Sequence, residues 1–227
     1  MKKISQHEIT DVVRYADDKI IIVEKIPAAL TKPNANYYVL NLKTFEKEAV
    51  TKSVYLMKKF GASSYQKITE QLTAVPQCDA VILPSREVFV LFPNGQCGLF
   101  SSYGELQWNK TLSYNDKEVH SLAYENGYLW CCCTEENCVI RYAADNFKVD
   151  LRIGGKEADT FRSPTFVSSD GEGIYVCCEG KRLRKIDLTD LTVSDVSDGI
   201  PQLTRFYRFG KISLLCTANG AYIGEDE

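Results

Sequence analysis

Three carboxylates stand at similar places along the chain, each ahead of a strongly apolar run. Asp11 in segment 10–13 and Asp79 in segment 78–81 hold equivalent positions, and Glu118 lies one place away in a third segment. Carboxyl groups held as a pair can act as general acid and general base. They can also accept hydrogen bonds from backbone N–H groups where a strand begins. We favour this structural role and keep the catalytic one as the alternative.

Nine cysteines against two histidines form the most unusual count in the composition. A zinc site needs about four ligands in a tetrahedral array, and the candidates are Cys131, Cys133 and Cys138 with Cys177 or Cys178. No pair has the C-x₂-C spacing, and the cysteines stand where other runs carry Val, Leu or Phe. We therefore expect no metal or other cofactor, and interpret the cysteines as small apolar core residues. A bridge between Cys133 and Cys138 is an alternative that a reducing compartment disfavours.

Two long segments, 24–36 and 52–77, separate the apolar runs in the first third of the chain. Loops longer than about 12 residues in a compact domain are usually functional or disordered. Lysines and aromatic residues in or beside these segments can contact an acidic or phosphorylated partner, namely Lys25, Lys32, Tyr37, Lys58, Lys59, Phe60, Tyr65 and Lys67. We call these residues the basic rim. The alternative is a solvated surface whose lysines only keep the protein soluble.

The elements that must position these residues are short strands. Apolar runs of about five residues, rich in β-branched and aromatic types, begin at Ile20, Val88, Tyr128, Ile174 and Ile212. Such runs, bounded by turn residues, are typical of strands buried on both faces. Their spacings are 68, 40, 46 and 38 residues. Three of the four match the period of about 40–50 residues of propeller blades, and an insertion at about 53–77 explains the first.

The turns around these runs support the same interpretation. Asn-Gly pairs at 94–95 and 219–220 separate apolar segments, which is the strongest short-range signal for a hairpin. More polar segments follow at 147–151 and 191–195, as expected for an outer strand in water.

Two stretches resemble known repeat families. Residues 129–142 resemble the hairpin between the second and third strands of WD-repeat propellers, and residues 163–176 are similar to the opening of an NHL-type blade. The Trp-Asp and Gly-His signatures of WD repeats are absent. The resemblance implies an all-β propeller architecture. The three carboxylates around a channel mouth also resemble five-bladed glycoside hydrolases.

The number of blades follows from the two ends of the chain. The fifth unit stops after a third strand near residue 225, and the alternating segment 3–9 can supply its outer strand. This predicts one domain over residues 1–227, a five-bladed propeller closed by its N-terminal strand. A six-bladed alternative needs a blade between 52 and 77, where the run 54–57 is followed by Lys58 and Lys59, poor residues for a buried strand.

Composition excludes several classes of protein. Lys and Arg number 27 against 30 Asp and Glu, a net charge of −3, which argues against a basic nucleic-acid-binding arm. No apolar run approaches the length of about 20 residues needed to cross a bilayer. The first residues lack the apolar core of a signal peptide, so we expect a cytoplasmic protein.

These observations predict a non-catalytic binding or scaffold propeller, rather than an enzyme, that docks a protein or peptide on the face carrying loops 24–36 and 52–77. We expect deletion of residues 58–72 to leave the fold intact and abolish docking. The alternative is a propeller that binds a small ligand or carbohydrate, with weak hydrolase activity from Asp11, Asp79 and Glu118.

Overall fold

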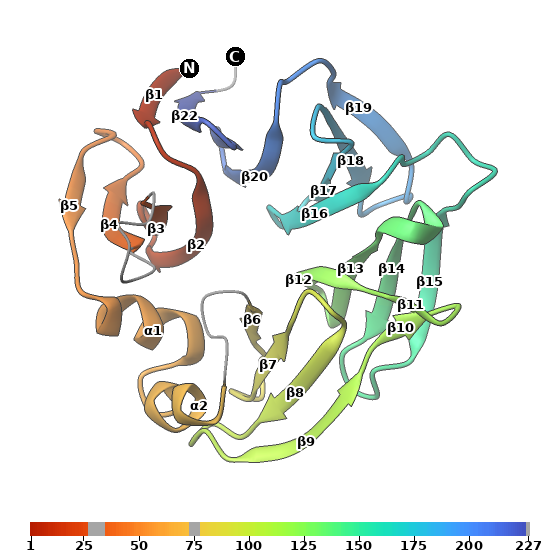
Figure 1. Cartoon of the computed structure of the whole chain (residues 1–227), viewed down its shortest axis with the longest axis horizontal. Coiled ribbons are helices and arrows are strands. Elements are labelled where there is room, and N and C mark those ends of the chain that lie inside the picture. The colour runs from red at the N-terminus through yellow and green to blue at the C-terminus, as the bar shows by residue number, and fades with distance from the viewer. Residues whose placement is uncertain (27–34, 73–77, 226–227) are drawn as a thin grey trace.

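The computed structural model describes residues 1–26, 35–72 and 78–225, which form a ring of five four-stranded antiparallel sheets (Figure 1). The predicted five-bladed propeller is confirmed. We number the blades 1 to 5 along the chain, and in each the first strand lies nearest the central channel.

Blade 1 contains β2 (Ile9–Ala16), β3 (Lys19–Lys25), β4 (Ala35–Asn41) and β5 (Lys47–Ala49). Blade 2 contains β6 (Asp79–Ile82), β7 (Val88–Leu91), β8 (Gln96–Phe100) and β9 (Leu106–Thr111). Blade 3 contains β12 (His120–Glu125), β13 (Tyr128–Cys133), β14 (Cys138–Ala143) and β15 (Val149–Gly154). Blade 4 contains β16 (Pro164–Ser169), β17 (Gly173–Cys178), β18 (Arg182–Asp187) and β19 (Val193–Ser197). Blade 5 contains β20 (Leu203–Phe209), β21 (Ile212–Thr217), β22 (Gly220–Glu225) and β1 (Lys2–Ser5).

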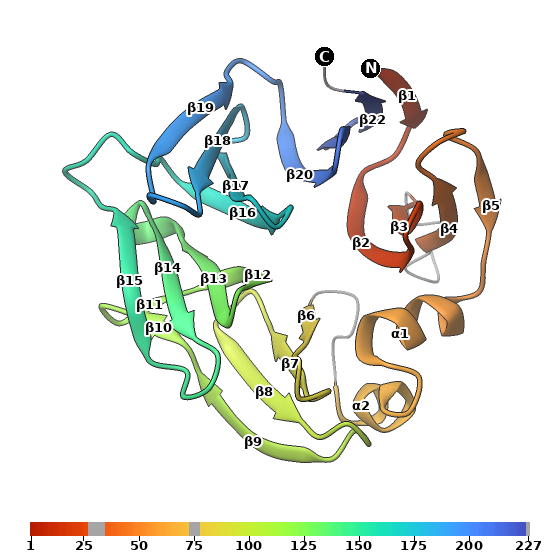
Figure 2. The ribbon, with the colours of Figure 1, turned by 180° about the vertical axis from the view of Figure 1, so that it is seen from behind.

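The N-terminal strand closes the ring as predicted. β1 pairs antiparallel with β22, so that Lys2 lies opposite Ile223 and Lys3 opposite Tyr222. Figure 2 shows the two ends of the chain meeting at this blade from behind. The pairing covers the outer edge of β22, which would otherwise offer unpaired backbone groups to another chain.

Segment 52–72 forms two helices rather than a sixth blade. Helix α1 (Lys52–Phe60) begins at Thr51, whose side chain accepts a hydrogen bond from the Val54 N–H, and ends at Gly61 with a φ of 87°. Helix α2 (Tyr65–Gln71) follows. Among the described residues, the only other ladder is the two-stranded hairpin β10 (Ser113–Tyr114) with β11 (Lys117–Glu118).

The two helices are wedged between blades 1 and 2 (Figures 1 and 2). Leu56 and Phe60 of α1 and Ile68 of α2 are buried in one apolar cluster with Ile21 of β3 and Val90 of β7. The two blades therefore meet through the helices. The expected dispensability of residues 58–72 is wrong for this reason, because deleting them would remove part of the core.

The second strands carry the core, as their apolar runs predict. The five buried cysteines of β13 and β17 lie among these strand residues. A short 3-10 helix, η2 (Thr134–Glu136), connects β13 to β14. No helix in the described ranges is long and apolar enough to cross a membrane.

Candidate functional site

The innermost strands of four blades share a bulge that sets which side chains meet at the channel. The pairing register shifts between Ile9 and Asp11 in blade 1, and between Leu203 and Arg205 in blade 5. Blades 3 and 4 have the same irregularity near the start of β12 and β16. A bulge places two residues opposite one and so shifts every later side chain by one position.

A threonine stabilises the bulge in three blades. The hydroxyls of Thr10, Thr165 and Thr204 donate to the second-strand carbonyls of Val23, Cys177 and Cys216 at 3.3, 3.3 and 3.2 Å. Each hydroxyl thereby replaces a ladder hydrogen bond that the extra residue interrupts. The residue after the threonine then occupies an equivalent place in each of these blades.

The equivalent residues that follow from this register form one ring around the channel. They are Asp11, Asp79, Leu122, Phe166 and Arg205, which lie opposite or next to the same position of the second strand in blades 1 to 5. Counting residues back from the apolar runs would instead align Asp11 with Pro164 or Thr165 and with Leu203, which lie one or two positions before the ring because of the bulge. Glu118 is also misplaced by spacing: it is exposed in the surface hairpin β10–β11, and Leu122 takes the position in blade 3.

Asp11 and Lys59 form a buried ion pair at one side of the channel. Lys59 Nζ donates to Asp11 Oδ2 at 2.5 Å, to the Tyr55 hydroxyl at 3.0 Å and to the carbonyl of Cys78 at 2.5 Å. The Tyr55 hydroxyl also donates to Asp11 Oδ2 at 2.5 Å, and the Val12 N–H donates to Oδ1 at 2.8 Å. All three Lys59 protons and both Asp11 oxygens are therefore used, and the pair ties α1 to blades 1 and 2.

The pKa shifts of this cluster favour the charged pair. Burial alone would raise the pKa of Asp11, but Lys59, Arg205 and the hydrogen bonds outweigh it and hold that pKa below its usual range. Burial alone would lower the pKa of Lys59, but Asp11 outweighs it and the pKa is raised. Burial and the Asp11 carboxylate raise the pKa of Tyr55 well above its ordinary value. Tyr55 thus remains a neutral donor to a permanent carboxylate.

Asp79 and Arg205 are held differently. They come from blades 2 and 5, which are not neighbours, and Arg205 Nη1 lies 3.9 Å from Asp79 Oδ1. This distance is an ion pair but too long for a hydrogen bond, and Nη1 has no hydrogen-bond partner among the described residues. Each side chain is 25% exposed. The two side chains are therefore partly exposed, but the Nη1 atom that lacks a hydrogen-bond partner is itself buried.

The surroundings of this second pair explain its electrostatics. Burial raises the pKa of Asp79, against the opposing charges of Arg205 and Lys59. Burial opposes the Arg205 charge too, but Tyr207 and the two carboxylates raise its pKa. The Arg205 guanidinium also lies over the Phe166 ring at 4.8 Å from its centre. That contact fixes the guanidinium plane through a cation–π interaction.

A cavity of about 220 Å³ is lined by Asp11, Lys59 and Asp79, and Arg205 is not among its lining residues. All five blades line it, through side chains or backbone that include Asp11, Asp79, Leu122, Phe166 and Tyr207. Hydroxyls join the innermost strands around it: the Val167 N–H donates to Ser121 Oγ at 3.0 Å, and Ser168 Oγ donates to the Phe206 carbonyl at 2.6 Å. These links make the wall of the cavity rigid. We call this cavity the channel pocket.

Most of the basic rim is engaged within the protein. Lys59 and Phe60 are buried, so they do not lie on the surface. Lys25 pairs with Glu8 at 3.0 Å, Lys67 with Glu105 at 3.4 Å, and Lys58 donates to the Tyr15 carbonyl at 2.9 Å.

The two tyrosines of the rim stay half-buried. The ring of Tyr37 contacts Tyr55 at 5.2 Å between centres, and Tyr65 packs at the edge of the cluster that holds α1. Lys32 lies outside the described residues, as do 27–34 of the first loop and 73–77 of the second. The described part of the rim therefore offers few side chains without an internal contact.

The cysteines do not converge. Cys131, Cys133 and Cys138 lie in one core cluster, whereas Cys132 and Cys178 lie in the next, because successive strand residues point to opposite faces. Cys133 lies directly opposite Cys138, and a hydrogen bond between the two lowers the pKa of Cys133 and raises that of Cys138. In the described ranges, no three His, Cys, Asp or Glu side chains gather as metal ligands would.

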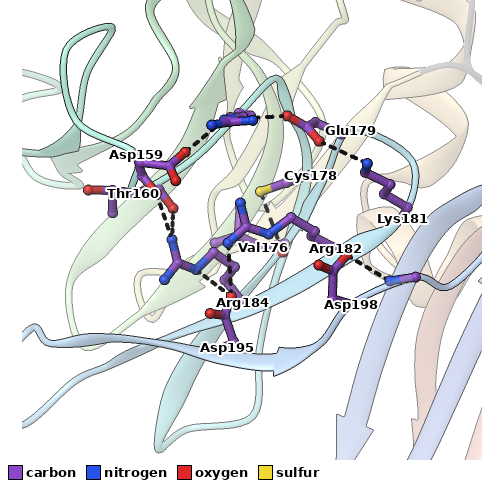
Figure 3. A network of polar contacts seen from close by, with 12 residues as sticks. Asp159, Thr160, Val176, Cys178, Glu179, Lys181, Arg182, Arg184, Asp195 and Asp198 are labelled. Atoms are coloured by element: carbon purple, nitrogen blue, oxygen red, sulfur yellow. Dashed lines mark hydrogen bonds and ion pairs between the residues drawn. The ribbon is translucent and has the colours of Figure 1, made fainter.

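A second charged cluster lies on blade 4 and holds the crossover from blade 3 (Figure 3). Arg184 donates to the carbonyls of Asp159 and Thr160 and pairs with Asp195, 3.1 Å from its Nε. Arg182 pairs with the same carboxylate at 3.2 Å. Since Arg184 binds main-chain carbonyls of the crossover, this cluster is a structural clamp rather than a site for a ligand.

Sequence reasoning identified two of the four charges at the channel and missed the role of the other two. The sequence predicts Lys59 at the surface, in the basic rim, and gives no prediction for Arg205. The signal available for Arg205 is its position directly after Thr204, matching Asp11 after Thr10. Recognising it requires knowing that the bulge recurs in blade 5.

Comparisons with known proteins bear on the fold only. No known family model matches the sequence, and no curated relative was found. A chain in the crystal structure of a nidogen/laminin complex is similar with a TM-score of 0.54 at 8% identity, over 94% of this chain and 75% of that one.

Two further solved structures are more distant. The computationally designed protein Ika8 and Saccharomyces cerevisiae Sqt1 both have a TM-score of 0.49, at 9% and 10% identity over 95% of this chain. This chain spans 58% of the length of each. The likeness to the chain in the nidogen/laminin complex, at 8% identity, shows the fold alone.

Proposed function

We propose that this propeller is a non-catalytic binding module whose protein or peptide partner inserts one side chain into the channel pocket. The observation that carries the proposal is the channel pocket itself, where the Asp79 carboxylate, 25% exposed, stands beside the aromatic side chains of Phe166 and Tyr207. A carboxylate in such a partly desolvated place can accept a hydrogen bond from an incoming group.

The size of the pocket supports a side chain rather than a free metabolite. Its volume of about 220 Å³ lies below the range of about 300–1,000 Å³ that is usual for small-molecule sites. A side chain buried in a central, rigid, desolvated pocket is the arrangement that contributes most to protein–protein affinity. The rest of the partner would then rest on the face around the channel mouth.

This proposal changes the role of the basic rim. Exposed ion pairs such as Lys25–Glu8 and Lys67–Glu105 contribute about 0–1 kcal/mol each. A partner can therefore displace these ion pairs at little cost in free energy, but contacts with their side chains supply little affinity. We assign them to the edge of the docking surface.

Two broader observations agree with a protein partner. The chain of similar fold comes from a crystal structure of a nidogen/laminin complex, and propellers without convergent catalytic groups commonly serve as platforms, an argument from fold alone. Nine buried cysteines used as core residues fit a reducing compartment such as the cytoplasm.

A small ligand or carbohydrate is the other candidate, favoured by the aromatic side chains of Phe166 and Tyr207 in the pocket wall. Acid–base hydrolysis by the predicted trio has less support. Asp11 already accepts from Tyr55, Lys59 and a backbone N–H, and Glu118 lies on the surface hairpin. A glycan array tests this candidate, with Asp79→Asn as the control for any glycan that binds.

Selection from a displayed library of random peptides on the immobilised full chain tests the proposal. Enriched peptides should lose about tenfold or more in affinity with Arg205→Met and Asp79→Asn, and retain affinity with the matched rim variant Lys67→Met. Peptides that lose affinity with Lys67→Met and not with the channel variants would overturn the proposal. So would the failure to enrich any peptide.

A further inference from the structure

A second cavity, of about 360 Å³, lies away from the channel, where blade 2 meets the end of α2. Strands β8 and β9 form most of its lining, and Gln71 and Leu72 line it from the helix. None of its lining residues in the described ranges belongs to the channel pocket. Its volume falls within the range of about 300–1,000 Å³ that is usual for small-molecule sites. We call this cavity the blade 2 pocket.

The blade 2 pocket exists because one large side chain is missing from blade 2. Gly98, in the third strand of that blade, pairs with Val90 of the second strand. The third-strand residues in the same register of blades 1, 3, 4 and 5 are Tyr38, Arg141, Arg184 and Tyr222.

In the other blades, this side chain contacts the outer strand. The Tyr38 ring lies 4.7 Å from Lys47 Nζ of β5, and Arg141 pairs with Asp150 of β15 at 2.5 Å. Gly98 makes no such contact, so the space over its strand stays open.

The backbone does not require glycine at this position. Gly98 is not among the residues with a positive φ. The nearest atoms that a Cβ would meet belong to the side chains of Leu106 and Phe100, at 3.3 Å each. The missing side chain therefore serves the cavity rather than the chain conformation.

The side chains around the blade 2 pocket are neutral. The polar ones are three carboxamides and a hydroxyl, and the apolar ones are aliphatic and aromatic: Gln71, Gln96, Asn109 and Thr111, with Leu72, Phe92, Phe100 and Leu106. Lys110 also borders the pocket, but its ammonium group lies over the rings of Trp108 and Phe147, at 4.6 and 4.8 Å from their centres. Since Trp108 and Phe147 pack against the cluster between blades 2 and 3, this charge points away from the pocket.

The polar side chains have hydrogen-bonding capacity to offer. Gln96, Asn109 and Thr111 are exposed and make no side-chain hydrogen bond within the described part of the chain. Gln71 is fixed, because its Nε2 donates to the carbonyls of Lys67 and Gly104 at 2.7 and 2.8 Å. Its carbonyl oxygen is left to accept. Free donors and acceptors thus surround an apolar floor.

A neutral, hydroxylated ring matches this lining. Each sugar hydroxyl both donates and accepts a hydrogen bond, as a carboxamide does. The C–H groups of the ring can pack against Leu106 and Phe100. A charged occupant would lose hydration here without meeting an opposite charge from the side chains that face the pocket.

We propose that the blade 2 pocket binds a neutral sugar. The inference goes beyond the proposed function and does not depend on it, since partner docking at the channel pocket uses none of these residues.

Saturation-transfer NMR on the full chain tests the inference with glucose, galactose and mannose, each beside its uronate anion and its 2-amino sugar in the ammonium form. At least one neutral sugar should bind, with an affinity about tenfold or more above that of its two charged analogues. Binding of none of the neutral sugars, or equal binding of a charged analogue, would overturn the inference.

Variants then assign the site. Gly98→Tyr supplies the residue that blades 1 and 5 carry and should abolish sugar binding, with a melting curve to show that the variant is folded. Asn109→Leu, at an exposed position, should weaken binding about tenfold even if Gly98→Tyr does not fold. Gln107→Leu, an exposed carboxamide of the same strand outside the pocket, is the matched control and should change nothing. Sugar binding that survives Asn109→Leu unchanged, or that is lost with Asp79→Asn instead, would overturn the inference.

Discussion

Arg205 of blade 5 faces Asp79 of blade 2 across the channel, with Nη1 3.9 Å from Oδ1. The two residues are separated by 126 positions and come from blades that share no edge. Their pairing distinguishes a site with unfilled capacity from the neighbouring Asp11–Lys59 pair, in which every proton and oxygen is used. We expect the Asp11–Lys59 pair to stabilise the fold and the Asp79–Arg205 pair to act in binding.

Breaking the buried pair should destabilise the protein. Lys59→Met leaves Asp11 buried without its cation, and we expect a loss of about 3–5 kcal/mol in the free energy of unfolding. Lys52→Met, at an exposed position on the same helix, should change it by less than about 0.5 kcal/mol. Urea denaturation measures both, and equal effects of the two substitutions would show that the pair is not structural.

The two carboxylates should respond to pH with opposite sign. The lowered pKa of Asp11 contributes stability that is present above its ordinary value of 3.8 and is lost as the pH falls below it. The raised pKa of Asp79 makes its ionised form costly at neutral pH, and that cost is relieved as the pH falls toward 3.8.

Denaturation curves at several pH values check these signs. As the pH falls from 7 to about 4, the wild type should gain stability relative to Asp79→Asn. Below that range it should lose stability relative to Asp11→Asn. The same sign for both variants would contradict the assignment of the two pairs.

Removing the N-terminal strand should expose the edge of β22. Deletion of residues 1–5 removes the pairing with Tyr222 and Ile223 and the buried side chain of Ile4. We expect a lower melting temperature and association between chains, measured by light scattering. A synthetic peptide of residues 1–8 added in trans should restore the monomer, and no change after deletion would contradict the closure.

The clamp on blade 4 should hold the crossover before β16. Arg184→Met removes the donor to the carbonyls of Asp159 and Thr160. Limited trypsin digestion should then cut faster after Lys156 and Arg162 than in the wild type. Lys185→Met, on the next residue of the same strand, serves as the control and should leave cleavage unchanged.

The cysteines should be unreactive in the folded protein. All nine are buried, and burial raises the pKa of Cys131, Cys132 and Cys177 well above the ordinary value. Because the thiolate is the reactive form, a thiol reagent should label them slowly until the chain is unfolded. Rapid labelling of several thiols in the native state would contradict their role as core residues.

The architecture was readable from the sequence because it depends on local patterns. Apolar runs, Asn-Gly turns and the alternation in segment 3–9 each reflect strand geometry, and together they predicted five blades and the closing strand. The wedge of α1 was not foreseen, since lysines 58 and 59 signalled a surface loop. Lys59 is buried only because Asp11 and the Cys78 carbonyl receive its protons.

The site was predictable only in part, for a related reason. Asp11 and Asp79 were found by their position in the repeat, whereas Arg205 was hidden by a bulge that shifts the register by one residue. Pairing across the channel joins residues far apart in the sequence, and no local pattern records it. Sequence spacing therefore locates two of the five positions in the ring and none of the pairings between them.

The most direct measurement of the central claim is the affinity of a selected peptide for the wild type, Arg205→Met, Asp79→Asn and the double variant, by fluorescence polarisation. If both residues hold one inserted side chain, each single change should cost about tenfold or more, and the double change should cost little more than either alone. Affinities that are unchanged in all three variants, while Lys67→Met abolishes binding, would contradict it.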